Sequence, residues 1–248
     1  MDFGDSPRVQ ALKAQVQRFM QDLILPSHRD WLRWSEAGAY PLDVIEPLKA
    51  RARAAGLWNL FLPGLRDDEP GTRLTNLEYA PLAEIMGRVP WASEVFNCSA
   101  PDTGNIELLQ LFATPAQRAQ WLRPLMDGTM RSCFAMSEPD VASSDPTNLG
   151  TRIARDGEHW VLNGRKWFAS NFKYASFLIA MVITDPDVPV HRGASMILVP
   201  KETPGIRAIR SVGLYDEPAG EGSHGYVEFT DCRVPKENLL GAEGAGMG

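Results

Sequence analysis

The sequence is poor in cysteine and has no long hydrophobic run. Its 248 residues include only three cysteines, Cys98, Cys133 and Cys232, which lie far apart and form no Cys-x-x-Cys pair. A disulfide framework is therefore not predicted, and a reducing, cytosol-like compartment is expected. The longest apolar run, Phe177 to Ile183, has seven residues, whereas a membrane-spanning helix needs about 20. We expect this run to form a buried strand.

Positive charge is not in excess either. The chain has 25 lysines and arginines against 31 aspartates and glutamates, a formal net charge of −6, which disfavours a basic surface for nucleic acid or an anionic membrane. The first five residues, MDFGD, lack the basic and then apolar order of a secretory signal. We therefore expect a cytoplasmic bacterial protein, with mitochondria and peroxisomes as alternatives.

Metal-binding and nucleophile motifs are also missing from the sequence. The four histidines, His28, His159, His191 and His224, share no metal-ligand spacing with one another or with the cysteines. We expect no metal site and interpret His224 as a turn residue. No G-x-S-x-G elbow and no papain-like cysteine context occurs, so Cys133 is expected to be a small buried hydrophobe.

Helical patterns fill the first half of the chain. Apolar residues from Leu12 to Leu23 fall on one helix face, and Pro26 is expected to end that helix. Another helix is expected to begin after Tyr40 and to end near Gly56. Further helices are predicted over 74–86, 106–112 and 115–126, the last with Thr114 as its N-cap.

Short β-rich runs replace the helical period from about Ser132 onward. Strands are predicted over 133–136, 151–155, 160–162, 165–168, 176–183, 195–199, 206–209 and 226–229. Asn163-Gly164 is predicted to form a two-residue type I′ hairpin turn, and Asp156-Gly157 a second turn.

The order of these patterns predicts an α+β fold. We expect an all-α helical domain over 1–130 and an antiparallel β-barrel or sandwich-like domain over 131–240. The glycine-rich residues 241–248 contain G-x-G-x-G, but the strand and helix of a dinucleotide-binding unit do not surround it. They are expected to begin a linker to a domain that the sequence does not include.

Two segments have the composition of a ligand site. In CFAMSEPDVASSD, residues 133–145, an apolar strand leads into a loop rich in hydroxyls, which can present donors to an anion or a polar ring edge. A plain strand-to-loop connection is the alternative. In KWFASN, residues 166–171, alternation places Phe168 and Ser170 on one face and Trp167 and Ala169 on the other. That pairing suits a flat heteroaromatic ligand, and a core strand with Trp167 buried is compatible with it.

In combination and in order, these motifs resemble the acyl-CoA dehydrogenase family, most closely the subgroup called family members 10 and 11. The resemblance covers nearly the whole chain and includes FNCSAPDTGN at 96–105, QWLRPL at 120–125 and FTDCRVP at 229–235. It implies an N-terminal helical domain, a middle β domain and a C-terminal four-helix domain. It also implies FAD and the oxidation of acyl-CoA thioesters to trans-2-enoyl-CoA, as in fatty acid β-oxidation. A carboxylate base removes the α-proton while the β-hydride moves to flavin N5.

The resemblance also implies binding residues. Phe134, Met136 and Ser137 would contact the flavin, with Ser137 near its pyrimidine edge. Phe168 and Ser170 correspond to the family's aromatic and hydroxyl pair, the latter near flavin N5, although many relatives carry Trp at the position of Phe168.

A serine near the FAD pyrophosphate and the substrate is implied as well. It is Ser143 or Ser144, and both stay open because DVASSD differs in length from the common GAGSD form. Asn97, Ala100 and Pro101 correspond by position to residues near the acyl pocket.

The family's catalytic carboxylate belongs to the C-terminal domain, so no catalytic residue is assigned in this sequence. We expect a truncated chain with little activity alone, electron-transfer flavoprotein as electron acceptor, and a homo-oligomer at full length. Two alternatives stay open. One is a non-catalytic remnant or a subunit of a split enzyme, and the other is an oxygen-using acyl-CoA oxidase or flavin monooxygenase.

Overall fold

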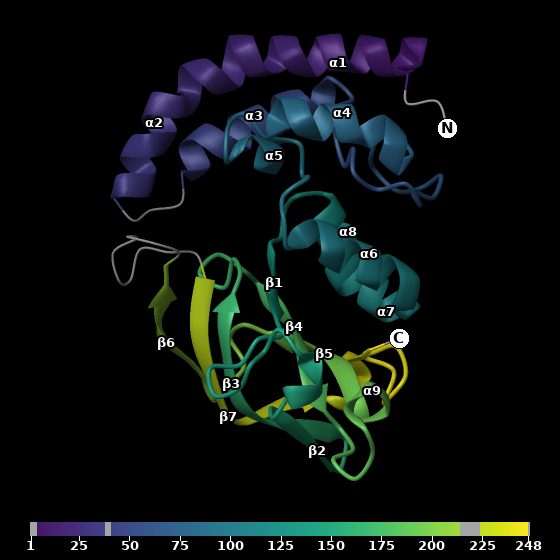
Figure 1. Ribbon diagram of the computed structural model, residues 1–248, viewed down its shortest axis with the longest axis vertical. Helices are drawn as coiled ribbons and strands as arrows, with labels where there is room; N and C mark the ends of the chain where they lie inside the picture. Colours follow the sequence, from purple (N-terminus) through teal and green to yellow (C-terminus); the bar gives the residue numbers. More distant parts are fainter. Residues whose placement is uncertain (1–3, 38–40, 214–223, 248) are drawn as a thin grey trace. The chain divides into compact units, whose positions relative to one another are not determined.

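The chain divides into a helical unit and a unit that contains the sheet. The computed structural model describes residues 4–37, 41–213 and 224–247. The two compact units are Met1–Thr103 and Gly104–Gly248, and Figure 1 shows helices in the first and the strands in the second. The predicted order of a helical part followed by a β part is confirmed.

The first unit is built from helices around an apolar core. Its elements are α1 (Pro7–Phe19), the π-helical turn η1 (Met20–Ile24), α2 (Leu25–Glu36), α3 (Leu42–Ala54), α4 (Asn76–Met86) and α5 (Ala92–Val95). Helix α1 packs against α4, and α3 packs against α5. Val16, Ile24, Leu48 and Leu82 are buried between them, which is what the 3.6-residue spacing of apolar side chains predicts. Gly56 follows α3 with a φ of 72°, as expected for a residue just past a helix end.

The helix expected to end at Pro26 continues beyond it. Helix α2 has Pro26 in its first turn and follows η1 without a break, so Pro26, which has no N–H to donate, lies inside a continuous helical stretch. The preceding turn, η1, is π-helical, and the Leu25 N–H donates to the Met20 carbonyl. The Ser27 hydroxyl donates to the Leu23 carbonyl at 2.8 Å. A change of hydrogen-bond register therefore carries the chain past the proline.

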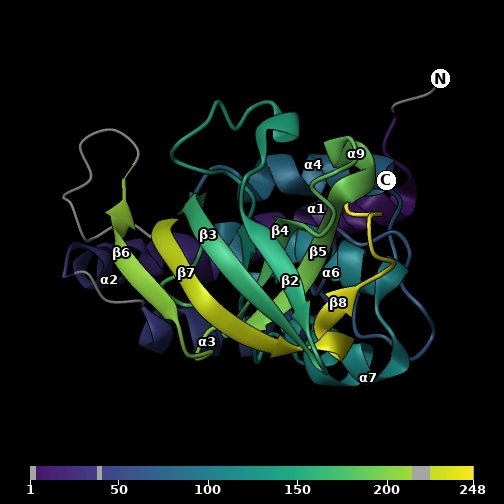
Figure 2. The same cartoon turned by 90° about the horizontal axis from the view of Figure 1, so that it is seen from below.

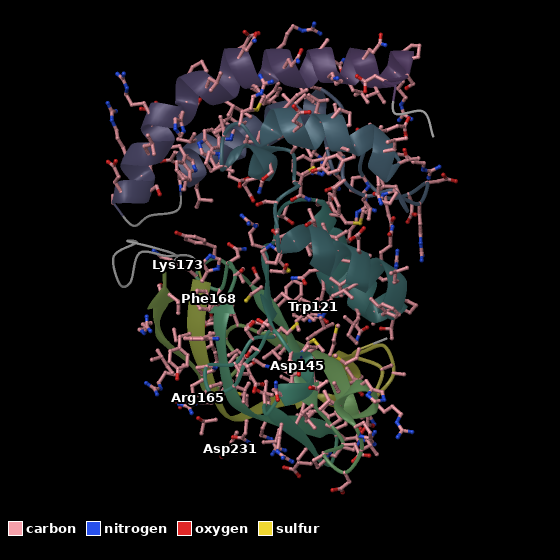
Figure 3. The ribbon with its side chains drawn as sticks, viewed as in Figure 1. Trp121, Asp145, Arg165, Phe168, Lys173 and Asp231 are labelled. Atoms are coloured by element: carbon pink, nitrogen blue, oxygen red, sulfur yellow. The ribbon has the colours of Figure 1, made fainter. Side chains whose placement is uncertain are left out.

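The second unit combines short helices with one sheet. The helical elements are α6 (Asp102–Phe112), which begins at the unit boundary, α7 (Pro115–Gln117), the π-helical turn η2 (Arg118–Leu122), α8 (Arg123–Met126), η3 (Pro146–Asn148), α9 (Val190–Gly193) and η4 (Lys236–Asn238). Thr114 caps α7, as predicted. The Trp121 ring packs against Phe177 with 4.8 Å between ring centroids, which joins η2 to the sheet (Figure 3).

The sheet is mixed and does not close into a barrel. Its strands are β1 (Ser132–Ala135), β2 (Arg152–Asp156), β3 (His159–Ala169), β4 (Phe177–Ile183), β5 (Ala194–Pro200), β6 (Ile206–Val212), β7 (His224–Pro235) and β8 (Leu239–Leu240). They lie in the order β6-β7-β3-β2-β4-β5-β8 (Figure 2). Strand β1 also pairs with β4. The β1–β4 and β2–β4 pairs are parallel, unlike the antiparallel arrangement expected. The β2–β3 hairpin separates β1 from β4 in sequence, and this long connection permits parallel pairing.

The predicted hairpin turn at Asn163-Gly164 is wrong, and the one at Asp156-Gly157 is confirmed. Strand β3 passes through Asn163 and Gly164 without turning, while Asp156 pairs with His159 across a two-residue turn. Gly164 instead allows a close approach: a Cβ there would lie 2.7 Å from the Thr151 hydroxyl.

Strand β4 forms the centre of the sheet. All seven of its residues are buried, as predicted from the uninterrupted apolar run. Cys133 belongs to the same apolar cluster, which confirms its role as a small buried side chain. No helix in the described parts of the chain is both long and apolar enough to cross a bilayer.

Candidate functional site

The two segments singled out in the sequence lie side by side in the second unit. Phe134, in β1, forms an isolated antiparallel bridge with Ser170, just after β3. The Trp167 N–H donates to the Ser137 carbonyl at 3.0 Å. Figure 3 places Phe168 and Lys173 at the same end of the sheet, whereas Asp231 lies at the other end. The structure thus brings together residues that the sequence separates by thirty positions or more.

A β-bulge shapes the β3 side of this site. The pairing of β3 with β7 shifts between Lys166 and Ala169, and Phe168 has a φ of 46°. An extra residue in one strand changes the direction of the side chains that follow. Ala169 is buried, but Trp167 is only half-buried, so the expectation of a buried Trp167 is wrong. Simple alternation fails here because the bulge interrupts it.

An aromatic ring, a hydroxyl and an imidazole gather at the bulge. The Phe168 and Trp167 rings meet edge to face with 5.0 Å between centroids. The Phe168 ring lies 6.2 Å from the His224 ring, and the Ser170 Oγ is 3.0 Å from His224 Nδ1. Phe168 and Ser170 thus share His224 as a neighbour.

The β1 side of the site rests on an apolar cluster. Phe134 and Met136 are half-buried and pack against Met181 and Ile183 of β4. Ser137, which follows them, is also half-buried. Along residues 134–137, Phe134, Met136 and Ser137 are therefore half-buried and only Ala135 is fully buried, beside the bulge of β3.

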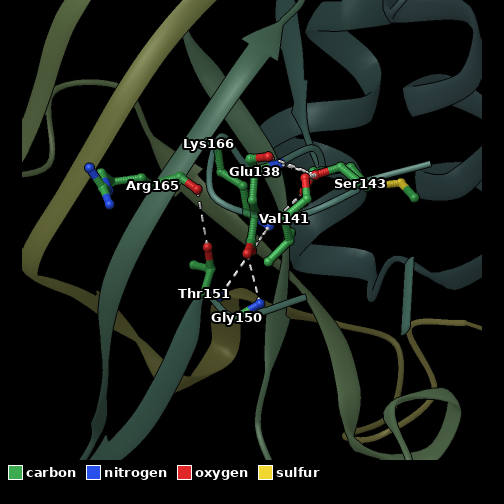
Figure 4. A network of polar contacts seen from close by, with 8 residues as sticks. Glu138, Val141, Ser143, Gly150, Thr151, Arg165 and Lys166 are labelled. Atoms are coloured by element: carbon green, nitrogen blue, oxygen red, sulfur yellow. Dashed lines mark hydrogen bonds and ion pairs between the residues drawn. The ribbon is translucent and has the colours of Figure 1, made fainter. Parts of the chain in front are cut away.

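A buried ion pair joins the two sides. Lys166 is fully buried, and its Nζ donates to the Met136 carbonyl and to Glu138 Oε1, each at 2.8 Å. Glu138 also accepts the N–H groups of Gly150, at 2.7 Å, and Thr151, at 2.9 Å (Figure 4). Three segments of backbone, at 136–138, 150–151 and 166, are fixed by these contacts.

Both members of the pair are charged at neutral pH. Burial alone would raise the pKa of Glu138, but hydrogen bonds from Lys166 and Thr151 outweigh it and hold that pKa below its usual 4.5. Burial lowers the pKa of Lys166 to about 8, although its bond to Glu138 acts in the opposite direction. Lys166 and Glu138 thus form an ion pair at pH 7.

The two candidate loop serines differ in their surroundings. The Ser143 hydroxyl accepts the Glu138 N–H at 2.7 Å and donates to the Glu138 carbonyl at 2.8 Å (Figure 4). Ser144 is exposed. Asp145 accepts the backbone N–H of Thr147 at 3.0 Å, which begins the η3 turn. Ser143 therefore links the loop to the backbone of Glu138, while the Ser144 side chain is exposed to solvent.

The three residues predicted near the acyl pocket belong to the first unit. Asn97 is 3% exposed, has a φ of 54°, and donates through Nδ2 to Asn59 Oδ1 at 2.7 Å. The Ala100–Pro101 peptide bond is cis. Ala100 is exposed and Pro101 is half-buried. The amide of Asn97 is thus engaged within its own unit, and a role in substrate binding stays a prediction for all three.

Lys166 and Glu138 were not assigned roles from the sequence. The interpretation of His224 as a turn residue is wrong, because it is the first residue of strand β7. Lys166 lies an even number of residues after Trp160 and Leu162, which are both buried. In a strand with a period of two, this position predicts a buried lysine, and a buried lysine needs a partner. No local signal marks His224, because its partner Ser170 lies 54 positions away.

The cysteines are inert by position. Cys98, Cys133 and Cys232 are all buried. Burial raises the pKa of the Cys98 thiol to about 12 and also raises that of Cys232. Within the described residues, no group of three or more histidine, cysteine, aspartate and glutamate side chains is arranged to hold a metal ion.

Chemically, this arrangement can hold a flat polar ring. A half-buried aromatic ring offers a stacking face, and the hydroxyls of Ser137 and Ser170 come from the segments that follow β1 and β3, which are joined by the Phe134–Ser170 bridge. The buried ion pair supports the backbone behind them. These donors and this face fit the ring system of a flavin.

Two protein-family models match the chain. The model described as "Acyl-CoA dehydrogenase, N-terminal domain" matches residues 6–129, and the one described as "Acyl-CoA dehydrogenase, middle domain" matches residues 133–232. The two models together cover almost the whole sequence. The second contains the Phe134–Ser170 bridge, the Lys166–Glu138 pair and His224, and the first contains Asn97, Ala100 and Pro101.

Curated relatives and solved structures agree with these models. Mouse acyl-CoA dehydrogenase family member 10 is 46% identical over 98% of this chain and 23% of its own length. FadE2 of Mycobacterium tuberculosis, named as an acyl-CoA dehydrogenase, is 45% identical over all of this chain and 61% of its own. A solved structure from Mycobacterium abscessus, described as an acyl-CoA dehydrogenase, shares 42% identity at a TM-score of 0.88, over 98% of this chain and 62% of its own. This chain thus spans less than two thirds of each of these three proteins.

Proposed function

From the premise that the chain belongs to the acyl-CoA dehydrogenase family, we propose that its second unit supplies the flavin-binding surface of an FAD-dependent dehydrogenase. The family supports an oxidoreductase function of the dehydrogenase type in lipid metabolism. The reaction that we propose for the whole protein is the oxidation of acyl-CoA thioesters to trans-2-enoyl-CoA. The observation that carries the proposal is the pairing of Phe134 with Ser170, which joins the two ligand-site motifs.

In this proposal FAD is held by residues on both sides of the bulge. Phe134, Met136 and Phe168 supply apolar and aromatic contacts to the ring system. The hydroxyls of Ser137 and Ser170 supply hydrogen bonds, which stabilise negative charge on the ring when it is reduced. Bound FAD would supply hydride acceptance, and no side chain in the described residues is proposed as the catalytic base.

Ser143 and Ser144 are proposed to lie near the pyrophosphate and the substrate, with different roles. Ser143 would shape the loop through its two bonds to the Glu138 backbone. Ser144, which is exposed, has its hydroxyl available for a direct contact. Asn97, Ala100 and Pro101 are proposed to contribute to the acyl-binding region.

Partners and compartment are proposed from the relatives. Similar structures include one that concerns an electron transferring flavoprotein from Acidaminococcus fermentans and one of the ChsE4–ChsE5 complex from Mycobacterium tuberculosis. These support electron-transfer flavoprotein as electron acceptor and an oligomeric whole protein. We propose a bacterial cytoplasmic location from the sequence, and FadE2 shows that the chain has a bacterial relative.

FAD binding to this chain tests the proposal. We expect Ser137→Ala and Ser170→Ala each to weaken FAD binding by about 5- to 30-fold, the equivalent of one lost hydrogen bond of about 1–2 kcal/mol. Titration of flavin fluorescence gives the dissociation constants. Ser176→Ala is the matched control, because Ser176 is exposed just before β4. Equal affinities for wild type and both site variants would refute the assignment of these residues.

A further inference from the structure

The Ser170 hydroxyl has a built-in partner in His224. Strand β3 pairs with β7 so that Ala169 lies opposite Gly225, and the next antiparallel position sets Ser170 opposite His224. Directly opposed side chains in such a pair have Cβ atoms about 4.5–5.5 Å apart. The observed separation of 3.0 Å between Ser170 Oγ and His224 Nδ1 is a hydrogen bond.

Close packing beneath the strand holds this pair in place. A Cβ on Gly225 would lie 2.8 Å from the Phe172 Cβ, so only glycine permits this approach of β7. The Phe168 ring lies 6.2 Å from the imidazole. His224 is therefore positioned by residues on each side of it along β3 and β7.

The chemistry of the two groups makes the direction of the bond important. A serine hydroxyl has a single proton to donate. If His224 Nδ1 carries a proton, it donates to Ser170 Oγ, and the serine proton is free to point away from the histidine. If Nδ1 is bare, the serine must donate to it, and Ser170 then offers only lone pairs to any other group.

We propose that His224 is a positioning residue that sets whether Ser170 presents a hydrogen-bond donor or an acceptor to the flavin. This inference rests on the proposed function. Flavin N5 accepts a hydrogen bond in the oxidised cofactor and carries a hydrogen in the reduced one. The direction of the Ser170 proton therefore changes the ratio of the protein's affinities for oxidised and reduced flavin. This ratio determines how far binding shifts the reduction potential of the flavin.

The contact itself can be tested without any cofactor. In ligand-free protein labelled with ¹⁵N histidine, Ser170→Ala is expected to change the ¹⁵N chemical shift of His224 Nδ1. His159, which is exposed at the other end of β3, should be unaffected, and the control Ser176→Ala should leave His224 unchanged. Identical His224 shifts in wild type and Ser170→Ala would overturn the inference.

The effect on the flavin is tested with two variants of His224. In His224→Asn, the side-chain amide keeps a polar group near the position of Nδ1. In His224→Leu, that polar group is lost. We expect His224→Leu to change the ratio of affinities for oxidised and reduced FAD by about tenfold, which is about 30 mV for two electrons. His224→Asn should restore most of the wild-type value. In Ser170→Ala, adding His224→Leu should change the ratio no further, because the two residues act through one bond.

The outcomes separate this inference from the proposed function. If wild-type protein does not bind FAD, the proposed function fails, and the inference fails with it. If FAD binds normally but the ratio is unchanged in His224→Leu, only the inference is overturned. Circular dichroism and urea unfolding of each variant identify those that fail to fold. If His224→Leu is among them, the ¹⁵N shift of His224 in ligand-free Ser170→Ala provides the decisive measurement.

Discussion

The two ends of β3 differ in regularity and in what they bury. Near its start, Trp160 and Leu162 point into the apolar cluster, and the strand pairs in register with both β2 and β7. Near its end, the buried position belongs to Lys166, and the bulge leaves Trp167 and Phe168 half-exposed. One end of the strand is therefore core, and the other is a surface that can contact a ligand.

The comparison shows how a strained segment is supported. The φ of 46° at Phe168 costs about 1–2 kcal/mol in a residue other than glycine. At the bulge, polar contacts replace the regular ladder. Lys166 donates to the Met136 carbonyl and to the Glu138 carboxylate, and the Trp167 N–H donates to the Ser137 carbonyl. The core end of β3 and the ion pair together offset this cost.

Among the changes at the bulged end of β3, loss of Lys166 should lower the free energy of unfolding most. Lys166→Met would leave Glu138 buried without its cation, at a cost of about 3–5 kcal/mol in the free energy of unfolding. Urea denaturation measures this change. The double variant Lys166→Met/Glu138→Leu should recover part of the loss, because no unpaired charge is left. A loss below about 1 kcal/mol in the single variant would show that the pair does not support the bulge.

A methyl group at Gly164, between the two ends, should have the next largest effect. A Cβ there would lie within 2.8 Å of Thr151 Cα and its side chain, at a φ of 146°. We expect Gly164→Ala to cost about 2–4 kcal/mol from steric overlap and backbone strain. Gly157→Ala is the matched control in the hairpin turn, with φ of 60° and nothing within 4 Å of the new Cβ, and should cost only about 1 kcal/mol. Equal losses would contradict the close approach of Thr151.

Glu138→Gln should produce a smaller loss with a distinct pH dependence. The amide can still accept N–H groups, so we expect about 1.5–3 kcal/mol at pH 7. The pKa of Glu138 lies below 4.5 in the folded protein, and the unfolded state therefore takes up its proton first as pH falls. The carboxylate contributes in full above about pH 4.5, and that contribution is lost as pH falls through the folded pKa.

Urea denaturation between pH 6 and pH 3 measures this dependence. The unfolding free energy of the wild type should fall more steeply over this window than that of Glu138→Gln. Parallel curves would mean that Glu138 does not titrate with a lowered pKa.

The two loop serines should show the smallest difference. Ser143→Ala removes two bonds to the Glu138 backbone and should cost about 1–2 kcal/mol. Ser144→Ala, at an exposed position, should change the unfolding free energy by less than about 0.5 kcal/mol. Thermal unfolding of the two variants gives this comparison directly. A larger loss in Ser144→Ala would reverse the roles assigned to the two serines.

Local signals predicted the type of most elements but not their connections. Asp156-Gly157 and Asn163-Gly164 look alike as turns, yet only the first turns the chain. The Asn163 side chain instead bonds to Asp231 on the neighbouring strand, with the Asp231 N–H donating to Asn163 Oδ1 at 2.8 Å. Pro26 likewise reads as a helix end, but a change to π-helical bonding lets the helix continue. Tertiary contacts decided these positions.

The site was predictable only in part for the same reason. The composition of residues 133–145 and 166–171 marked both segments as ligand-site candidates, and the structure brings them together at Phe134 and Ser170. The bulge at Phe168 depends on the pairing of β3 with β7, which a local pattern does not encode. His224 reaches Ser170 only through that pairing.

The three buried thiols can be used to measure local opening of the folded chain. Cys98 belongs to the helical unit, while Cys133 and Cys232 belong to the unit with the sheet. A thiol reagent can modify each one only when its surroundings separate, so the rate of alkylation at each site measures the free energy of local opening. Mass spectrometry of the three cysteine-containing peptides would therefore give separate rates of local opening for the two units from a single sample. No further label has to be introduced into the protein.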